Sequence, residues 1–113
     1  EATAAVLAIV PRGRMVTYGH VGDGNLHFNV SEPAGGDRKA FLSLAAEIHA
    51  SVHDVVHRYR GSISAEHGIG RLKRAALAVH EGPVAIDVMR SLKRALDPNG
   101  ILNPGKVLPD PDT

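Results

Sequence analysis

The stretch from Met15 to Val30 constrains the fold more than any other part of the sequence, because polar and apolar residues alternate on both sides of Asp23-Gly24. An Asp-Gly pair between two alternating segments is a strong signal for a β-hairpin with a two-residue turn. Such a turn pairs residue i with residue 47 − i, which places His20 opposite His27. The sequence therefore predicts an antiparallel hairpin on which two imidazoles face each other.

The two faces of this hairpin differ in their chemistry, because successive side chains of a strand point to opposite sides. One face is apolar apart from a hydroxyl and consists of Met15, Thr17, Gly19, Val21, Leu26, Phe28 and Val30. The other face consists of Tyr18, His20, Asn25, His27 and Asn29. We expect the first face to cover a core and the second to be available for function.

Apolar residues at helical spacing predict that most of the remaining chain is helical. The expected elements are helices over residues 1–10, 38–60, 71–80 and 83–96 and a short strand over 62–64. Asp37 suits the N-cap of the second helix, Gly61 follows its end, and Pro83 suits the first turn of the last helix. The tail over 101–108 is expected to be irregular and apolar enough to dock. A hairpin with packed helices predicts an α+β fold, and we expect residues 1–113 to form one structural unit.

Composition excludes several classes of function. Thirteen Lys and Arg against 12 Asp and Glu leave a net charge of +1, which provides no field for binding nucleic acid. The absence of cysteine excludes disulfides, thiolate metal sites and cysteine nucleophiles, and leaves seven histidines as the notable reactive groups. The longest apolar stretch is far too short to span a bilayer, so we expect a soluble protein. A chain that begins at Glu1 in a helical pattern is expected to be a processed product or a fragment.

His20 and His27 could share one cation, and a carboxylate would complete a set of two histidines and one acid that suits Zn²⁺, Mn²⁺ or Fe²⁺. Glu66 is the candidate, since it follows the predicted strand in a glycine-rich turn. The alternative is that both histidines are partly buried residues satisfied by hydrogen bonds. Glu66 taken alone would be a solvated carboxylate or a helix cap.

Two further residues have alternative interpretations. His67 is either a general base near a reacting hydroxyl or a turn residue with an unusual backbone. Asn29 either donates a hydrogen bond to a bound carboxylate or is a polar partner of Tyr18 across the hairpin.

Other patterns carry less weight. Histidines 49, 53 and 57 recur every four residues, but no local acidic trio completes a site, so a solvated helix flank is favoured. Gly68-Ile69-Gly70 lacks the remaining residues of a nucleotide-binding loop. Ser62 and Ser64 lack the glycines of a hydrolase elbow.

Three motifs together resemble the C-terminal domain of FAD-linked oxidases of the vanillyl-alcohol oxidase superfamily, a group that includes D-lactate dehydrogenase, the glycolate oxidase D subunit and D-2-hydroxyglutarate dehydrogenase. They are Gly19-His-Val-Gly-Asp-Gly-Asn-Leu-His27, Ser64-Ala-Glu-His-Gly-Ile-Gly70 and Leu96-Asp-Pro-Asn-Gly-Ile-Leu-Asn-Pro-Gly-Lys106. The resemblance implies part of a ferredoxin-like substrate or cap domain. It also implies that the upstream FAD-binding domain is absent from residues 1–113.

The resemblance further assigns roles to residues. It implies that His20, His27 and Glu66 hold a divalent metal, for which Zn²⁺ is favoured over Mn²⁺ and Fe²⁺. It implies that His67 removes the proton of the substrate hydroxyl and that Asn29 helps to hold the substrate. Asn103 is the expected contact with FAD, and its alternative is a turn residue before proline.

The implied activity is oxidation of a D-2-hydroxy acid such as lactate, glycolate or 2-hydroxyglutarate to the 2-oxo acid, with hydride transfer to FAD. The implied partners are the hydroxy acid, the FAD-binding domain of the parent chain and an unidentified electron acceptor. The chain alone is expected to be inactive, and an incomplete sheet with an exposed edge would favour self-association. We expect a cytoplasmic location, with any membrane association peripheral and through the electron acceptor.

Two other functions are consistent with the residues alone. One is a non-catalytic metal-binding or interaction module with structural histidines. The other is a hydrolase or oxygenase that uses the same metal ligands without flavin. A module whose histidines are structural predicts that metal analysis finds no stoichiometric ion and that chelators leave thermal stability unchanged. The metal hydrolase or oxygenase predicts activity from these residues without FAD.

Overall fold

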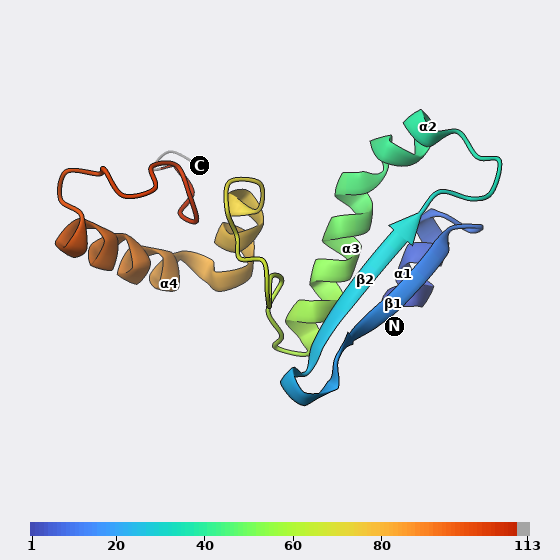
Figure 1. Cartoon of the computed structure of the whole chain (residues 1–113), viewed down its shortest axis with the longest axis horizontal. Coiled ribbons are helices and arrows are strands. Elements are labelled where there is room, and N and C mark those ends of the chain that lie inside the picture. Colours follow the sequence, from blue (N-terminus) through green and yellow to red (C-terminus); the bar gives the residue numbers. More distant parts are fainter. Residues whose placement is uncertain (111–113) are drawn as a thin grey trace. The chain divides into compact units, whose positions relative to one another are not determined.

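The computed structural model describes residues 1–110, and the chain divides into two compact units, Glu1–Ser62 and Ile63–Thr113 (Figure 1). The elements in chain order are α1 (Ala2–Ile9), β1 (Arg14–His20), the 3-10 helix η1 (Val21–Asp23), β2 (Asn25–Ser31), α2 (Arg38–Ser43), α3 (Ala45–Arg58) and α4 (Arg74–Leu96). One two-stranded antiparallel sheet with helices confirms the predicted α+β class. Within residues 1–110, no helix has the length and apolar character that crossing a membrane requires.

The hairpin forms where the sequence predicts it, but its predicted register is wrong. Tyr18 pairs with His27, and His20 pairs with Asn25 rather than with His27. The reason is the connection, which contains η1 and Gly24 and is therefore four residues long instead of two. Gly24 closes it in a left-handed conformation, with φ 64°, that favours glycine. The resulting shift is two residues, and because the side-chain period is also two, every strand residue keeps its predicted face.

The core of the first unit lies between α1, α3 and the hairpin. Val6, Val10 and Ile48 are buried at its centre. The partly buried residues that pack against them are Ile9, Met15, Phe28, Val30, Phe41, Leu44 and Val52. The predicted apolar face of the hairpin therefore covers the core over part of its length.

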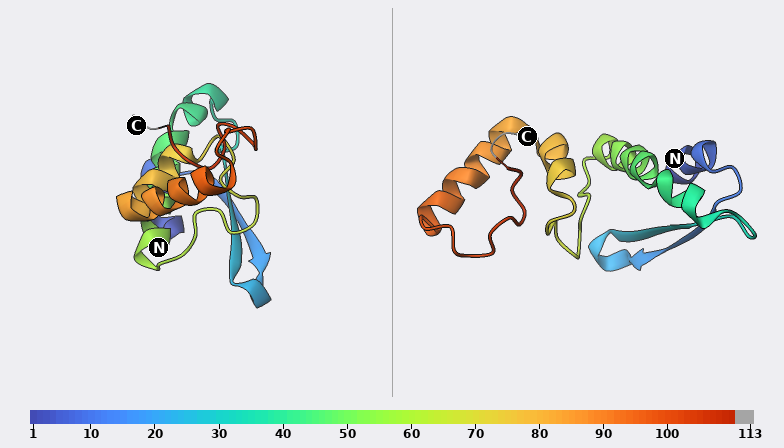
Figure 2. Two further views of the ribbon diagram at one scale, coloured as in Figure 1. Left: turned by 90° about the vertical axis from the view of Figure 1, so that its left-hand side faces the viewer. Right: turned by 90° about the horizontal axis from the view of Figure 1, so that it is seen from above.

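The loop end of the hairpin is an exception to this pattern. Leu26 is 63% exposed and Val21 is 98% exposed. Val21 belongs to η1 and not to a strand, and this end of the hairpin stands apart from α1 and α3 (Figure 2). The expectation that Val21 and Leu26 cover a core is wrong for this reason.

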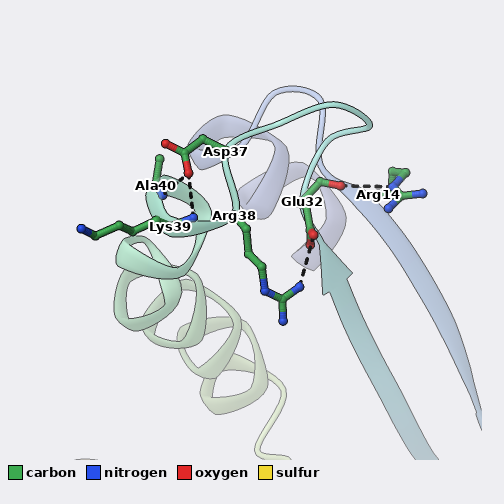
Figure 3. A network of polar contacts seen from close by, with 6 residues as sticks. All are labelled: Arg14, Glu32, Asp37, Arg38, Lys39 and Ala40. Carbon is green, nitrogen blue, oxygen red and sulfur yellow. Dashed lines mark hydrogen bonds and ion pairs between the residues drawn. The ribbon is translucent and has the colours of Figure 1, made fainter.

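Asp37 caps α2 as the sequence predicts. Its Oδ1 accepts hydrogen bonds from the backbone N–H groups of Lys39, at 2.8 Å, and Ala40, at 3.3 Å (Figure 3). The single helix expected over 38–60 is divided at Leu44, which lies between α2 and α3 with φ −88° and ψ −2°. At the other end of α3, Arg60 rather than Gly61 takes the left-handed conformation, with φ 53°.

A second polar network is centred on Glu32, which directly follows β2, and connects it to β1 and to the first residue of α2. Arg14 Nε donates to the backbone carbonyl of Glu32 at 3.1 Å, and Arg38 Nη1 donates to the Glu32 carboxylate at 3.3 Å (Figure 3). A hydrogen bond from its own backbone, followed by the charges of Arg38 and Arg14, holds the pKa of Glu32 below its ordinary value. These contacts fix the chain after the hairpin, because they join Glu32 to both β1 and α2.

The second unit contains α4, which is broken at Gly82. This glycine has φ 75° and ψ 169°, a backbone conformation open to glycine alone, and Pro83 follows it at the start of the next helical stretch. The two helices predicted here are therefore present, and the first begins at Arg74 rather than at Arg71. The strand predicted over residues 62–64 is absent, because this segment has no partner strand within residues 1–110.

The tail after α4 is irregular, as predicted, and its apolar residues pack only at its end, where Leu108 is half-buried and Pro109 is buried. Ile101 is 74% exposed and Leu102 is 56% exposed. Polar contacts also hold the tail, since Arg74 donates to the Gly105 carbonyl at 3.1 Å and pairs with Asp110. Short irregular segments leave backbone carbonyls unpaired, and guanidinium donors can satisfy several of them at once.

Candidate metal centre and substrate site

The hairpin brings the side chains of His20 and His27 together although they are not directly opposed. His20 pairs with Asn25, so His27 is its diagonal neighbour on the same face. The two imidazole centroids lie 5.7 Å apart with an interplanar angle of 66°. Diagonal neighbours on a sheet are within reach of each other when their side chains are aromatic. His27 is half-buried and His20 is exposed, so the pair is accessible from solvent.

The imidazole pair fits a divalent transition metal by the chemistry of its donors. Imidazole nitrogen is a common ligand of Zn²⁺, and two imidazoles on one face offer two such nitrogens. A second histidine pair occurs on α3, where His49 and His53 stack with centroids 6.2 Å apart. Within residues 1–110, no third His, Asp or Glu joins that α3 pair in a group able to hold a metal ion. On α3, His49 and His57 are exposed and His53 is half-buried.

Tyr18 lies directly opposite His27 and stacks on its ring. The centroids of the phenol and imidazole rings are 4.8 Å apart, and the two rings are within 14° of parallel. Asn29 lies two residues beyond His27 on the same face, is exposed and pairs with Val16. The alternative in which Asn29 is the cross-strand partner of Tyr18 is therefore wrong, because the register differs by two residues.

Glu66 and His67 lie at the tip of a short loop in the second unit. His67 Nε2 is 3.9 Å from Glu66 Oε2, and both side chains are well exposed to solvent. The Ser64 hydroxyl donates to the carbonyl of Gly68 and so closes the loop. Gly68 has φ 72°, which permits the reversal of the chain after His67.

Lys73 supports this loop and was not identified from the sequence. Its Nζ donates to Ser64 Oγ at 2.9 Å from a half-buried position. The sequence predicted Ser64 at the end of a short strand and gave it no role in holding the loop. The available signal was a serine at the start of a glycine-rich turn, since such hydroxyls commonly bond to nearby backbone groups.

The tail motif lies next to the end of the same glycine-rich segment. The backbone N–H of Val107 donates to the carbonyl of Gly70 at 2.8 Å. Asn103 is exposed and has φ 46°, a left-handed conformation that asparagine tolerates better than most residues. Within the second unit, this bond joins the end of the Ser64–Gly70 motif to the residue that directly follows the tail motif, more than 30 residues away in sequence.

The six predicted site residues are divided between the two units. His20, His27 and Asn29 belong to Glu1–Ser62, whereas Glu66, His67 and Asn103 belong to Ile63–Thr113. The structure brings the histidine pair together in the first unit and the Glu66–His67 pair together in the second.

Comparison with known proteins relates these residues to a family. The family described as FAD linked oxidases, C-terminal domain, matches residues 3–107. The chain is 43% identical to D-2-hydroxyglutarate dehydrogenase of Stutzerimonas stutzeri (strain A1501) over 107 residues, which are 95% of this chain and 23% of that protein. It is 49% identical to the mitochondrial D-2-hydroxyglutarate dehydrogenase of Danio rerio over 96 residues, or 85% of this chain and 17% of that protein.

A plant relative shows a similar relationship. The chain is 46% identical to the mitochondrial D-2-hydroxyglutarate dehydrogenase of Arabidopsis thaliana over 92 residues, which are 81% of this chain and 16% of that protein. It therefore spans less than a quarter of the length of these relatives. Because the family match covers nearly all of the chain and includes the histidine pair, the Glu66–His67 loop and the tail motif, the protein belongs to the FAD linked oxidases, C-terminal domain family.

Proposed function

We propose that this chain is the metal- and substrate-binding portion of an FAD-dependent D-2-hydroxyacid dehydrogenase that forms the 2-oxo acid. Among lactate, glycolate and 2-hydroxyglutarate, we favour D-2-hydroxyglutarate, because the relatives at 38–49% identity carry that substrate in their names. The observation that carries the proposal is the convergence of two imidazoles, His20 and His27, on one face of a hairpin that matches the family.

The proposed ligands of the metal are His20, His27 and Glu66. Two neutral imidazoles and one carboxylate suit Zn²⁺, and they leave coordination positions open for a substrate. When bound, the cation would supply Lewis acidity to the substrate's hydroxyl and carboxylate groups, and FAD would supply the redox chemistry that side chains lack.

The remaining residues of the proposed site act on protons and on substrate orientation. His67 accepts the proton of the C2 hydroxyl on a ring nitrogen, a role for which an imidazole is suited near neutral pH. The exposed amide of Asn29 donates a hydrogen bond to a substrate carboxylate. Asn103 contacts FAD, and the hydrogen bond between Val107 and Gly70 supports this role because it holds the tail near the loop that carries His67.

The exposed face of α4 supports the proposal that the flavin-binding part of the parent polypeptide is a binding partner of this chain. Val84, Val88 and Leu92 are each more than half exposed, and with Asp87 and Ser91 they line a shallow hollow. An apolar strip of this kind on a protein surface is typical of an interface. The relatives are at least four times as long as the segment they share with this chain, so the remainder of the polypeptide is the occupant we propose.

The full-length protein tests the proposal. D-2-hydroxyglutarate should reduce the bound FAD, and D-lactate and glycolate serve as competing substrates. We expect His67→Ala to lower turnover by about 10²–10⁴ with little effect on Zn²⁺ content. His49→Ala is the matched control, because it removes an imidazole from α3 outside the site. Turnover of His67→Ala at the wild-type rate would disprove the assignment of the base.

A further inference from the structure

We infer that Tyr18 is a positioning residue that sets the ring plane of His27 before a metal ion binds. This inference rests on the proposed function, because it assumes that His27 is a metal ligand. Its basis is the direct pairing of the two residues across the hairpin and the near-parallel stacking of their rings. The angle between the ring planes is 14°, and the ring centroids are 4.8 Å apart.

Burial does not account for the tyrosine at this position. Tyr18 is 57% exposed and lies on the polar face of the hairpin, away from Val6, Val10 and Ile48 in the core. An exposed aromatic side chain gains little from the hydrophobic effect, whereas a cross-strand aromatic pair contributes roughly 0.2–1 kcal/mol. Its contact with the His27 ring is therefore the interaction that distinguishes Tyr18 from other residues of the strand.

The stacking restricts one of the two side-chain torsions that a histidine ligand must fix. Rotation of an imidazole about its χ2 angle decides where both ring nitrogens point, and this torsion has a broad profile. Metal-binding histidines are commonly oriented by a partner outside the first set of ligands. Here the phenol ring covers one face of His27, and the His20 ring meets it at 66°. Two ring contacts thus restrict the plane of His27 and reduce the entropy lost when a cation binds.

Three substitutions in the full-length protein separate the contribution of the Tyr18 ring from that of its hydroxyl. A control variant accounts for effects on general stability. Tyr18→Phe retains the stacking ring, Tyr18→Leu retains bulk without an aromatic face, and Tyr18→Ala removes both. Val16→Ala is the matched control, because Val16 lies on the same face of β1 and is similarly exposed. Affinity for Zn²⁺ is measured by competition with a chromogenic chelator, and the His27 ring protons are followed by NMR without metal.

We expect Tyr18→Leu and Tyr18→Ala to weaken Zn²⁺ binding about 10-fold, at the lower end of the range for residues that orient a metal ligand. Both should also move the His27 ring protons downfield, because the ring current of the phenol is lost. Tyr18→Phe and Val16→Ala should bind Zn²⁺ within about twofold of wild type. Equal affinity of wild type and Tyr18→Leu, or equal losses in Tyr18→Phe and Tyr18→Ala, would overturn the inference.

His27→Ala distinguishes this inference from the proposal beneath it. If His27→Ala leaves the affinity for Zn²⁺ unchanged, His27 is not a ligand and both proposals fail. If His27→Ala weakens binding while Tyr18→Leu does not, only the role of Tyr18 is overturned.

Discussion

The ammonium group of Lys73 lies 2.9 Å from the hydroxyl of Ser64 and donates a hydrogen bond to it. Ser64 in turn donates to the carbonyl of Gly68, so a relay of two hydrogen bonds closes the loop that carries Glu66 and His67. A loop with exposed tip residues has little apolar burial to order it. Its conformation therefore depends on side chains that have no part in the proposed chemistry.

Removing the Ser64 hydroxyl should loosen this loop. We expect Ser64→Ala to lower the free energy of unfolding by about 1 kcal/mol, the net value of a typical hydrogen bond. Amide hydrogen exchange at residues 65–68 should accelerate, because the loop loses its closing contact. Ser91→Ala is the control, since the Ser91 hydroxyl donates to the Asp87 carbonyl within α4. Unchanged exchange in Ser64→Ala would show that the relay does not order the loop.

Zinc should stabilise the protein if His20 and His27 bind it in the folded state. A ligand that binds only the folded state adds about 2.7 kcal/mol at a concentration of 100 Kd. We therefore expect Zn²⁺ to raise the unfolding temperature, and a chelator to reverse the shift. The double variant His20→Ala/His27→Ala should lose the response, whereas His49→Ala should retain it. A response of equal size in the double variant would place the zinc site elsewhere.

Asp97 should make stability sensitive to acid. The ammonium of Lys93, followed by the backbone N–H groups of Leu102 and Ile101, holds the pKa of the Asp97 carboxyl below its ordinary value. A carboxyl with a lowered pKa in the folded state stabilises the fold above its ordinary pKa, which is about 3.9 for Asp. That contribution is lost as the pH falls through the lowered value.

The measurement is thermal unfolding of wild type and Asp97→Asn from neutral pH down to about pH 2. We expect Asp97→Asn to be less stable at neutral pH and to lose less stability on acidification. Asp87→Asn is the control, because the Asp87 side chain is 75% exposed and pairs with Arg90 at 3.7 Å. Parallel acid profiles of wild type and Asp97→Asn would contradict this role of Asp97.

The Asp37 cap on α2 predicts that two substitutions of Asp37 differ in their effect on stability. Asp37→Ala removes the oxygen that accepts from the N–H groups of Lys39 and Ala40, and it should cost about 1 kcal/mol in urea denaturation. Asp37→Asn should remain close to wild type, because asparagine caps helices about as well as aspartate. A similar loss in both variants would mean that the charge of Asp37 matters more than the hydrogen bonds.

Local signals in the sequence predicted several elements because their causes lie within a few residues. Asp37 caps a helix through its own neighbours, and Gly82 followed by Pro83 breaks one through backbone geometry. The interruption at Leu44 and the absence of a strand over 62–64 had no such local signal. A strand exists only with a partner, and Ser64 bonds instead to the loop in which it lies.

By itself, the sequence determined which residues share a face of the hairpin and which family the chain resembles. Alternation determines the face of a residue, because each step along a strand turns the side chain to the other side. Only the tertiary structure decided the pairing along that face. The four-residue connection that ends at Gly24 shifts the strands by two residues, which keeps every face and changes every partner. For this reason Tyr18, and not His20, lies directly opposite His27.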